Sequence, residues 1–268
     1  MLGKNYDKTP EEVEFGDQLA LIIKKIINGQ VPAEVQPILS DCEIFAGPKC
    51  RPIAPAIVYR KIAAIVLLQR LKDFNKNYFA GLQEALNKNG IENIIHPFRA
   101  NLDINPDQDV FAMDGENAFN RCNRKQTLVT ILREAPTILP YIRSFYGTSS
   151  KVWYHGLTDA IRTIDCQEGF QQGDTIATWC YSVGIQPLLM EINAIIGNNG
   201  FLKFFVDDGN IAGNFETNLK VIGHLLEHGP KYGYYISKLK GSYLLGKCES
   251  CEEAARRKQK LVGDLVQI

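Results

Sequence analysis

The sequence predicts an α+β fold in which a mainly antiparallel sheet is backed by helices. Three observations lead to this prediction. The 268 residues are 45% hydrophobic, which is enough to bury a sizeable core. From Asp109 onward, short apolar runs of strand length alternate with longer runs whose apolar positions recur at helical spacing. The most apolar short run is followed by an Asp-Gly pair, which is typical of a tight hairpin between antiparallel strands.

The first hundred residues are expected to be mostly helical. Three helices are predicted, at residues 9–28, 57–71 and 74–89. The first has a helix start, with Thr9 as the capping residue and Pro10 at the first helical position, and it should stop at Gly29. Proline and glycine punctuate residues 31–55, which are therefore expected to be mostly loop.

The rest of the chain is expected to mix strands and helices. Strands are predicted at residues 109–114, 152–154, 161–166, 201–206, 234–236 and 242–245. Helices are predicted at residues 120–133 and 174–196, and a third is marked by Phe215, Leu219, Ile222 and Leu226. The hairpin turn is placed at Asp208 and Gly209, with Ile211 on the returning strand.

The charge balance sets limits on the partners. Thirty basic residues balance thirty acidic ones, so a polyanion would have to be bound by local clusters of positive charge. The apolar run at residues 62–68 is far short of the roughly 20 residues that a membrane helix needs. The N-terminus lacks the apolar core of a secretory signal. We expect an intracellular chain with no membrane partner, in the nucleus or the cytoplasm.

Two patterns suggest zinc, and we consider both weak. Cys248 and Cys251 have the spacing of a zinc half-site, but Cys42 and Cys50, which would complete it, are separated by seven residues rather than by a short gap. Seven cysteines, an odd number, suit reduced thiols better than disulfides. Residues 224–228 spell the H-x-x-E-H signature of inverted zinc peptidases, but no third ligand can be placed.

Three aspartates lie at strand ends or turns of the predicted sheet. Asp114 ends one strand, and Asp207 and Asp208 lie at the hairpin, so the fold would bring them to one edge. Such carboxylates repel one another unless a cation lies between them, and Mg²⁺ prefers one or two carboxylates together with substrate phosphates. Two ions about 3.5–4 Å apart can catalyse an in-line phosphoryl displacement. The alternative is an ordinary solvated Asp-Asp-Gly turn.

Five segments in order along the chain resemble the successive motifs of a reverse transcriptase. They are Arg51 to Ala54, Asp114 to Asn120, Gln167 to Asp174, Phe205 to Asp208, and Gly229 to Tyr235 followed by Lys240. The match is closest to the retrotransposon type that lacks long terminal repeats, and it covers about residues 50–246. Its most specific elements are Asn-Ala-Phe-Asn at residues 117–120 and Gln-Gly-Asp at residues 172–174.

The resemblance implies a polymerase palm with part of the fingers and a thumb that is absent or rudimentary. Residues 1–107 would form N-terminal helices and fingers, residues 108–246 the palm, and residues 247–268 a basic tail or thumb remnant. The implied activity is RNA-directed DNA polymerase, which adds deoxynucleotides from their triphosphates to a primer paired with an RNA or DNA template. The implied cofactor is Mg²⁺, with Mn²⁺ as the alternative. A truncated or domesticated remnant that binds nucleic acid or protein without catalysis is the competing interpretation.

The resemblance also implies roles for single residues. The metal ligands and catalytic acids would be Asp114, Asp207 and Asp208. The nucleotide-binding residues would be Arg51, Gly115, Phe119, Gln172, Gly173 and Lys240. Phe119 would be the steric gate that excludes a 2′-hydroxyl, unless its ring simply packs in the sheet. Arg51 would grip the triphosphate and Lys240 would lie near it, although both could also be solvated surface charges.

Some features depart from the usual pattern of the family. Thr175 follows Gln-Gly-Asp where proline is usual, and Glu116 adds a negative charge beside the acids. Twenty-two residues follow residue 246, which is short for a thumb, although the tail carries basic residues at 256–258 and at Lys260. Because affinity for a duplex comes largely from phosphate contacts, we expect weak, salt-sensitive binding of the primer and template.

Overall fold

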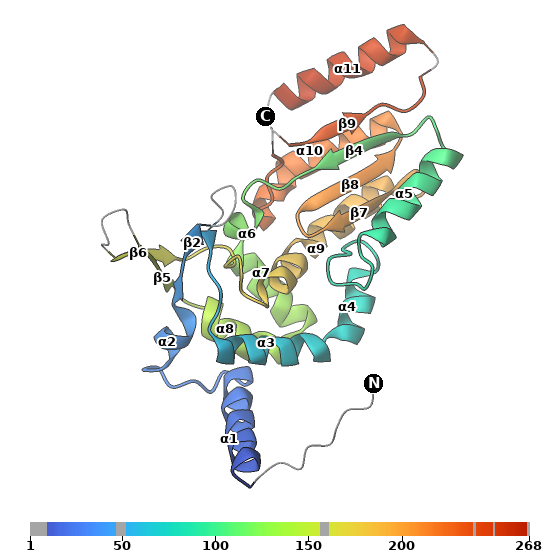
Figure 1. Ribbon diagram of the computed structural model, residues 1–268. Helices are drawn as coiled ribbons and strands as arrows, with labels where there is room; N and C mark the ends of the chain where they lie inside the picture. Colours follow the sequence, from blue (N-terminus) through green and yellow to red (C-terminus); the bar gives the residue numbers. More distant parts are fainter. Residues whose placement is uncertain (1–9, 47–51, 156–160, 238–239, 249, 267–268) are drawn as a thin grey trace. The chain divides into compact units, whose positions relative to one another are not determined.

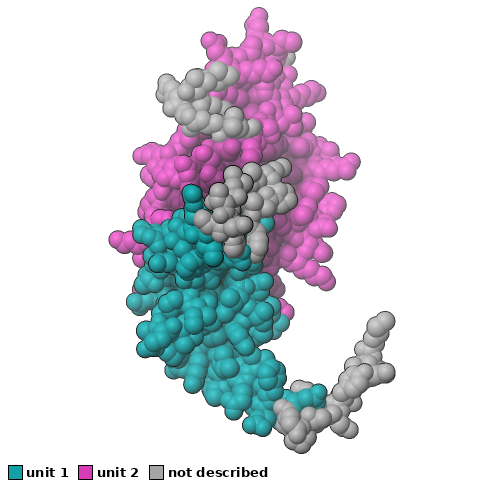
Figure 2. Space-filling view, turned by 60° about the vertical axis from the view of Figure 1, so that its left-hand side comes forward, with its two compact units in different colours: residues 1–70, 135–167, 173–175 teal, residues 71–134, 168–172, 176–268 magenta. Residues whose placement is uncertain are grey.

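The computed structural model describes residues 10–46, 52–155, 161–237, 240–248 and 250–266. The chain folds into two compact units, each built from separate stretches of sequence. Unit 1 comprises residues 1–70, 135–167 and 173–175, and unit 2 comprises residues 71–134, 168–172 and 176–268 (Figure 2). The proposed boundaries at residues 107 and 246 stay a prediction.

Unit 1 contains helices and two small sheets. Its helices are α1 (Pro10–Ile27), α2 (Gln36–Ser40), α3 (Val58–Arg70) and α8 (Leu139–Tyr146), with a 3₁₀ turn at Pro136–Ile138. Its strands are β1 (Cys42–Glu43), β2 (Phe45–Ala46), β3 (Pro52–Ile53), β5 (Ser150–His155) and β6 (Ile161–Cys166). One sheet has the strand order β1-β5-β6, with β1 and β5 parallel, and the other pairs β2 with β3. The predicted loop at residues 31–55 therefore also holds a short helix and three two-residue strands.

Helices α1 and α3 form where the sequence predicts them, while Thr9, the expected cap of α1, lies outside the described residues. Gly29 ends α1 at a φ of +67°, which costs glycine little because it has no Cβ. A Cβ there would lie 2.9 Å from the carbonyl oxygen of Pro140, so α8 passes too close for any other residue. In α3, Ala63, Ala64 and Leu67 are buried on one face.

Unit 2 is built on a four-stranded sheet with the order β7-β8-β4-β9, in which all neighbours are antiparallel (Figure 1). The strands are β4 (Asp109–Met113), β7 (Gly200–Phe205), β8 (Asp208–Gly213) and β9 (Ser242–Leu244). The helices are α4 (Lys72–Phe79), α5 (Glu92–Ile104), α6 (Ala118–Arg121), α7 (Arg124–Glu134), α9 (Ala177–Ile196), α10 (Phe215–Tyr232) and α11 (Cys251–Val266).

Helices cover the sheet of unit 2 and bury its apolar side chains. Helix α9 is apolar on nearly all sides and is almost completely buried, because α7, α10 and β7 all pack on it. Helix α10 also packs on β8 and β4. Helix α5 packs on the sheet through Phe98, whose ring lies 4.3 Å from that of Phe201. These layers confirm the predicted α+β fold with an antiparallel sheet backed by helices.

Two predicted helices differ in their extent, and one helix of unit 2 was not predicted. The helix predicted at 74–89 ends at Phe79, because Ala80 and Gly81 adopt positive φ and residues 82–84 pair with β7 instead. The helix predicted at 120–133 is broken, since the Asn123 side chain accepts a hydrogen bond from the amide of Gln126 and starts α7. Helix α5, which contains a proline, was not predicted.

The strand predicted at residues 234–236 reduces to a single bridge between Gly115 and Ile236. Among the described residues, no helix has both the length and the apolar character needed to span a bilayer.

Candidate active site

The register of the sheet brings Asp114 to the hairpin between β7 and β8. Met113, the last residue of β4, pairs with Gly209, and Asp208 pairs with Phe205 across the hairpin. Asp114 therefore leaves β4 at the end of the sheet where the turn lies. A Cβ at Gly115 would lie 3.3 Å from the Cβ of Asp207, so the two segments are in van der Waals reach. Two acids far apart in the sequence thus meet at one edge, as predicted.

The hairpin turn differs from the prediction. Its two central residues are Val206 and Asp207, while Asp208 and Gly209 already belong to β8. Val206 has a φ of +59°, a conformation that β-branched residues rarely adopt. Gly209 is needed inside the strand for another reason, because a Cβ there would lie 2.3 Å from the ring of Phe204. The placement of the turn at Asp-Gly was therefore wrong by two residues.

Two buried tyrosines report the negative charge at this edge. The hydroxyl of Tyr234 donates to the carbonyl oxygen of Asp207 at 3.3 Å. Burial raises the pKa of Tyr234 well above its usual value, and the charges of Asp207, Asp114 and Asp208 raise it further. Burial, followed by several charges that include Asp207 and Asp114, also raises the pKa of Tyr181. All three predicted acids therefore lie close enough to act on the same phenol.

Lys240 also belongs to this group. Its Nζ donates to Oδ2 of Asp114 at 2.7 Å. The Lys240 side chain is 62% exposed and that of Asp114 is 18% exposed, so water screens the pair. Lys240 was expected to lie near the triphosphate; the structure shows its contact with Asp114, and its expected role stays a prediction.

The donor set suits a hard divalent cation bound together with a ligand. Among the described residues, no three His, Cys, Asp or Glu side chains are grouped closely enough to hold a metal ion by themselves. Mg²⁺ does not require such a cage, because one or two carboxylates with substrate phosphates and water complete its shell. Asp114 and Asp207 offer two such carboxylates, so the residues present fit a magnesium ion whose remaining ligands come from outside the chain.

Phe119 is anchored beside the acids. It lies in α6, and its half-buried ring stacks on that of Tyr181, with centroids 5.2 Å apart and 24° between the planes. The backbone is held as well, since the carbonyl oxygen of Phe119 accepts from the amide of Phe170 at 2.7 Å. Phe119 therefore packs on helix α9 rather than in the sheet, and its role as a gate stays a prediction.

Three further residues were predicted to bind the nucleotide, namely Gln172, Gly173 and Arg51. Gln172 is half-buried in unit 2, and Gly173 belongs to unit 1. Gly173 has a φ of +101° and packs against Ile53, so any other residue there would strain the backbone. Arg51 lies outside the described residues.

The aspartate of the Gln-Gly-Asp segment has a structural function that sequence reasoning missed. In unit 1, Asp174 accepts hydrogen bonds from the guanidinium of Arg60 and from the hydroxyl of Tyr146. Arg60 is completely buried and lies 4.5 Å from the centre of the Phe145 ring. In the structure, Arg60 shares the buried face of α3 with Ala63 and Leu67, and no sequence signal indicated this, because arginine is rarely fully buried unless it is paired.

Within the part of the chain that the structure describes, neither zinc pattern gains a further ligand. His224 and His228 share one face of α10, with ring centroids 4.3 Å apart, but His224 pairs with Glu191 of α9 at 2.9 Å. Burial raises the pKa of the Cys42 thiol to about 11, which favours the neutral thiol over the thiolate that zinc binds. Cys42 is in unit 1 and Cys248 in unit 2, while Cys50 lies outside the described residues.

Comparisons with known proteins were made by sequence and by structure. No protein-family model matches the chain, and no curated protein matches it significantly. Among solved structures, apo telomerase from Candida tropicalis truncated from its C-terminal domain matches with a TM-score of 0.64 and 15% identity, over 88% of this chain and 56% of that one.

Telomerase complexes with the TWJ fragment of telomeric RNA also match. The C. tropicalis complex has a TM-score of 0.64 and 14% identity, over 89% of this chain and 46% of that one. The Candida albicans complex has a TM-score of 0.60 and 11% identity, over 80% and 44%. The chain thus spans about half the length of these structures. Its fold is similar to that of telomerase over this part, which confirms the predicted α+β fold class.

Proposed function

We propose that this chain is an RNA-directed DNA polymerase that transfers deoxynucleotides to the 3′-hydroxyl of a primer. One observation carries the proposal: the register of β4 against β8 brings Asp114 beside the turn that carries Asp207. The polymerase fold supports it. The motif order and the specific segments at residues 117–120 and 172–174 favour the retrotransposon type without long terminal repeats.

In the proposed phosphoryl transfer, each residue at the sheet edge would have its own role. Asp114 and Asp207 would hold Mg²⁺ or Mn²⁺ together with the triphosphate oxygens. The bound ions supply charge stabilisation for the attacking and leaving oxygens. Lys240 would neutralise the triphosphate and hold a proton near the pyrophosphate, and the contact of its ammonium with Asp114 supports this role. Asp208 adds negative charge at the same edge.

Phe119 is the residue that would select deoxynucleotides. Stacking on Tyr181 fixes the plane of its ring, so the ring cannot easily turn away from a sugar placed against it. An apolar ring offers no partner for a 2′-hydroxyl and, in the proposed role, would occupy the space that this hydroxyl needs. Replacing Phe119 with alanine should raise ribonucleotide incorporation about tenfold or more relative to deoxynucleotide incorporation, as expected for loss of about 1.4 kcal/mol of discrimination. Competition assays with both nucleotides measure this ratio, and an unchanged ratio would argue against the gate.

The partners would be a primer paired with an RNA or DNA template, and deoxynucleoside triphosphates. Two basic residues of α11 already have acidic partners, because Arg257 pairs with Asp109 and Glu253, and Lys260 pairs with Glu216. These contacts leave fewer cations for phosphates and support the expectation of weak, salt-sensitive binding.

The deciding experiment is primer extension on an RNA template with purified protein and Mg²⁺. The parent should extend the primer, and Asp207→Asn should abolish extension while its circular dichroism spectrum and unfolding midpoint stay unchanged. Extension by Asp207→Asn at the parent rate would refute the assignment. A parent that binds the primer and template but never extends it would instead favour the catalytically inactive remnant.

A further inference from the structure

The residue before Asp207 is held in an unfavourable backbone conformation. Val206 has a φ of +59°, and a β-branched side chain in this region costs on the order of 1–3 kcal/mol. Such a conformation persists only where neighbouring groups enforce it. Because Val206 and Asp207 are the two central residues of the turn, the backbone of Val206 also sets the direction of the Asp207 side chain.

A buried glutamine bonds both backbone polar groups of Val206. The Nε2 of Gln83 donates to the carbonyl oxygen of Val206 at 2.9 Å, and the amide of Val206 donates to Oε1 of Gln83 at 2.8 Å. A primary amide is the side-chain group that can donate and accept at once on one short edge. Gln83 is 0% exposed, so water does not compete for these bonds.

The segment around Gln83 is itself anchored to β7. The amide of Phe204 donates to the carbonyl of Leu82 at 2.7 Å, and the amide of Glu84 donates to the carbonyl of Phe204 at 2.8 Å. The buried Glu84 carboxylate accepts from Nζ of Lys203 at 2.8 Å. These bonds come from β7, the strand that leads into the turn, so Gln83 cannot shift along the strand without breaking them.

We propose that Gln83 is a positioning residue for the candidate active site: its amide holds Val206 in the left-handed conformation and thereby orients Asp207. Gln83 touches no reacting group, and it acts through the turn. The effect on catalysis rests on the proposed function, whereas the effect on the turn does not.

The test is a double-mutant cycle between Gln83→Met and Val206→Gly. Methionine has about the same length but can neither donate nor accept these hydrogen bonds well. Glycine adopts positive φ without strain, so the turn should then need the amide much less. In the Val206 background, Gln83→Met should lower kcat about tenfold or more with little change in the KM for nucleotide, because a displaced catalytic group costs rate. In the Val206→Gly background, the same change should lower kcat less than about threefold.

A second measurement does not depend on activity. Amide hydrogen exchange at Val206 should be about tenfold or more faster in Gln83→Met than in the parent, because its bond to Oε1 is lost. The amide of Phe204 should stay protected. If Gln83→Met does not fold, Gln83→Asn replaces it, since its amide is one methylene too short to reach both groups.

Gln186 provides the matched control. It is also a fully buried glutamine that donates to backbone carbonyls, but those of Tyr78 and Phe79, away from the turn. Gln186→Met should lower stability without changing kcat per folded molecule or exchange at Val206. The proposal is overturned if Gln83→Met leaves exchange at Val206 unchanged, or if it lowers kcat equally in both backgrounds. A parent without primer extension would refute the proposed function, while the exchange data would still decide the role of Gln83.

Discussion

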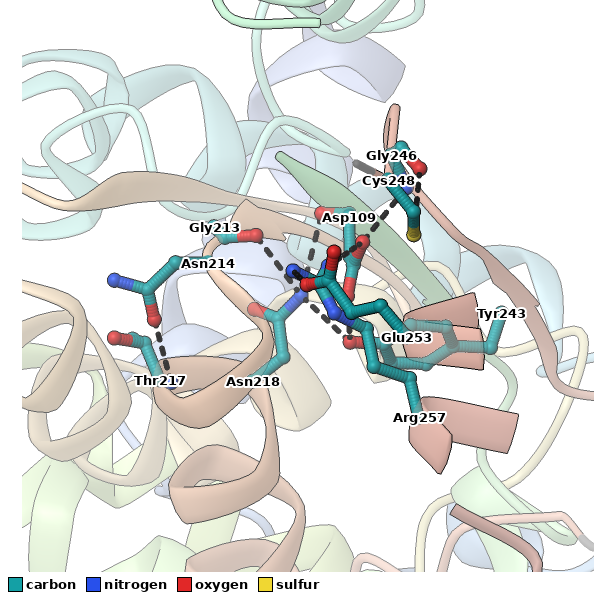
Figure 3. A network of polar contacts seen from close by, with 10 residues as sticks. All are labelled: Asp109, Gly213, Asn214, Thr217, Asn218, Tyr243, Gly246, Cys248, Glu253 and Arg257. Carbon is teal, nitrogen blue, oxygen red and sulfur yellow. Dashed lines mark hydrogen bonds and ion pairs between the residues drawn. The ribbon is translucent and has the colours of Figure 1, made fainter. Parts of the chain in front are cut away.

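Strand β4 carries an aspartate at each end, and the two are in opposite environments. Asp109, at the start, is 0% exposed and accepts hydrogen bonds from the hydroxyl of Tyr243 at 2.9 Å and from the amide of Gly246 at 2.7 Å (Figure 3). Arg257 lies 3.3 Å away. Asp114, just after the strand, is partly exposed and contacts Lys240, whose side chain is mostly in water.

The difference shows that burial decides whether an aspartate stabilises the fold, as Asp109 does, or stays accessible to a ligand, as Asp114 does. The carboxylate of Asp109 is satisfied by groups from β9, the segment after it and α11, so it joins these elements and has no capacity for a ligand. The carboxylate of Asp114 is held by an exposed ammonium that a cation can replace at little cost. Substitutions at the two ends should therefore separate stability from activity.

The largest expected effect is on catalysis and concerns Asp114, at the C-terminal end of β4. Asp114→Asn should lower primer extension about 10³-fold, because several kcal/mol of metal-assisted stabilisation is lost. The unfolding midpoint in urea should stay close to that of the parent. Single-turnover extension together with urea titration measures both. If Asp114→Asn unfolds at much lower urea, Asp114 is a structural residue like Asp109.

For Asp109, at the N-terminal end of β4, the expected effect is on stability. Asp109→Asn should lower the free energy of unfolding by about 2 kcal/mol, since it removes the buried one of the two carboxylates that pair with Arg257 and weakens the hydrogen bonds from Tyr243 and Gly246. Extension per folded molecule should be nearly unchanged. Urea unfolding followed by circular dichroism measures the first quantity, and extension normalised to the folded fraction measures the second. A large loss of normalised activity would mean that the two ends of β4 are coupled.

The smallest expected effect concerns the partner of Asp114. Lys240→Met should change the free energy of unfolding by less than about 1 kcal/mol, because the exposed pair is screened by water. Arg257→Met should cost more, since Arg257 pairs with the buried Asp109. Parallel urea titrations compare the two variants, and equal losses would remove the distinction between the two ends of the strand.

Much of this sheet edge follows from local pattern. The alternating apolar residues of β4 and the apolar run of β7 identify both strands, and the Asp-Gly pair indicates a hairpin nearby. The meeting of Asp114 with Asp207 was therefore predictable. The position of the turn was not, because Val206 opposes its own backbone preference and is held by Gln83, which is 123 residues away in the chain.

Helix α5 and the true end of α4 were missed for related reasons. Pro97 inside α5 is a local signal against a helix, yet packing of Ile94 and Phe98 on the sheet outweighs it. After Phe79, the chain leaves α4 to pair Leu82 and Glu84 with β7, a gain that helical periodicity cannot reveal.

From its residues taken in order, this chain already specifies most of its strands and helices, the α+β class, and the meeting of Asp114 with the hairpin that carries Asp207, because periodicity and short-range turn chemistry are local properties. Only the folded molecule decides which aspartate is buried and where the chain reverses. It also decides that Arg60 lies in a core. The partners of these groups come from more than a hundred residues away, and burial and hydrogen bonding exist only once those segments are brought together.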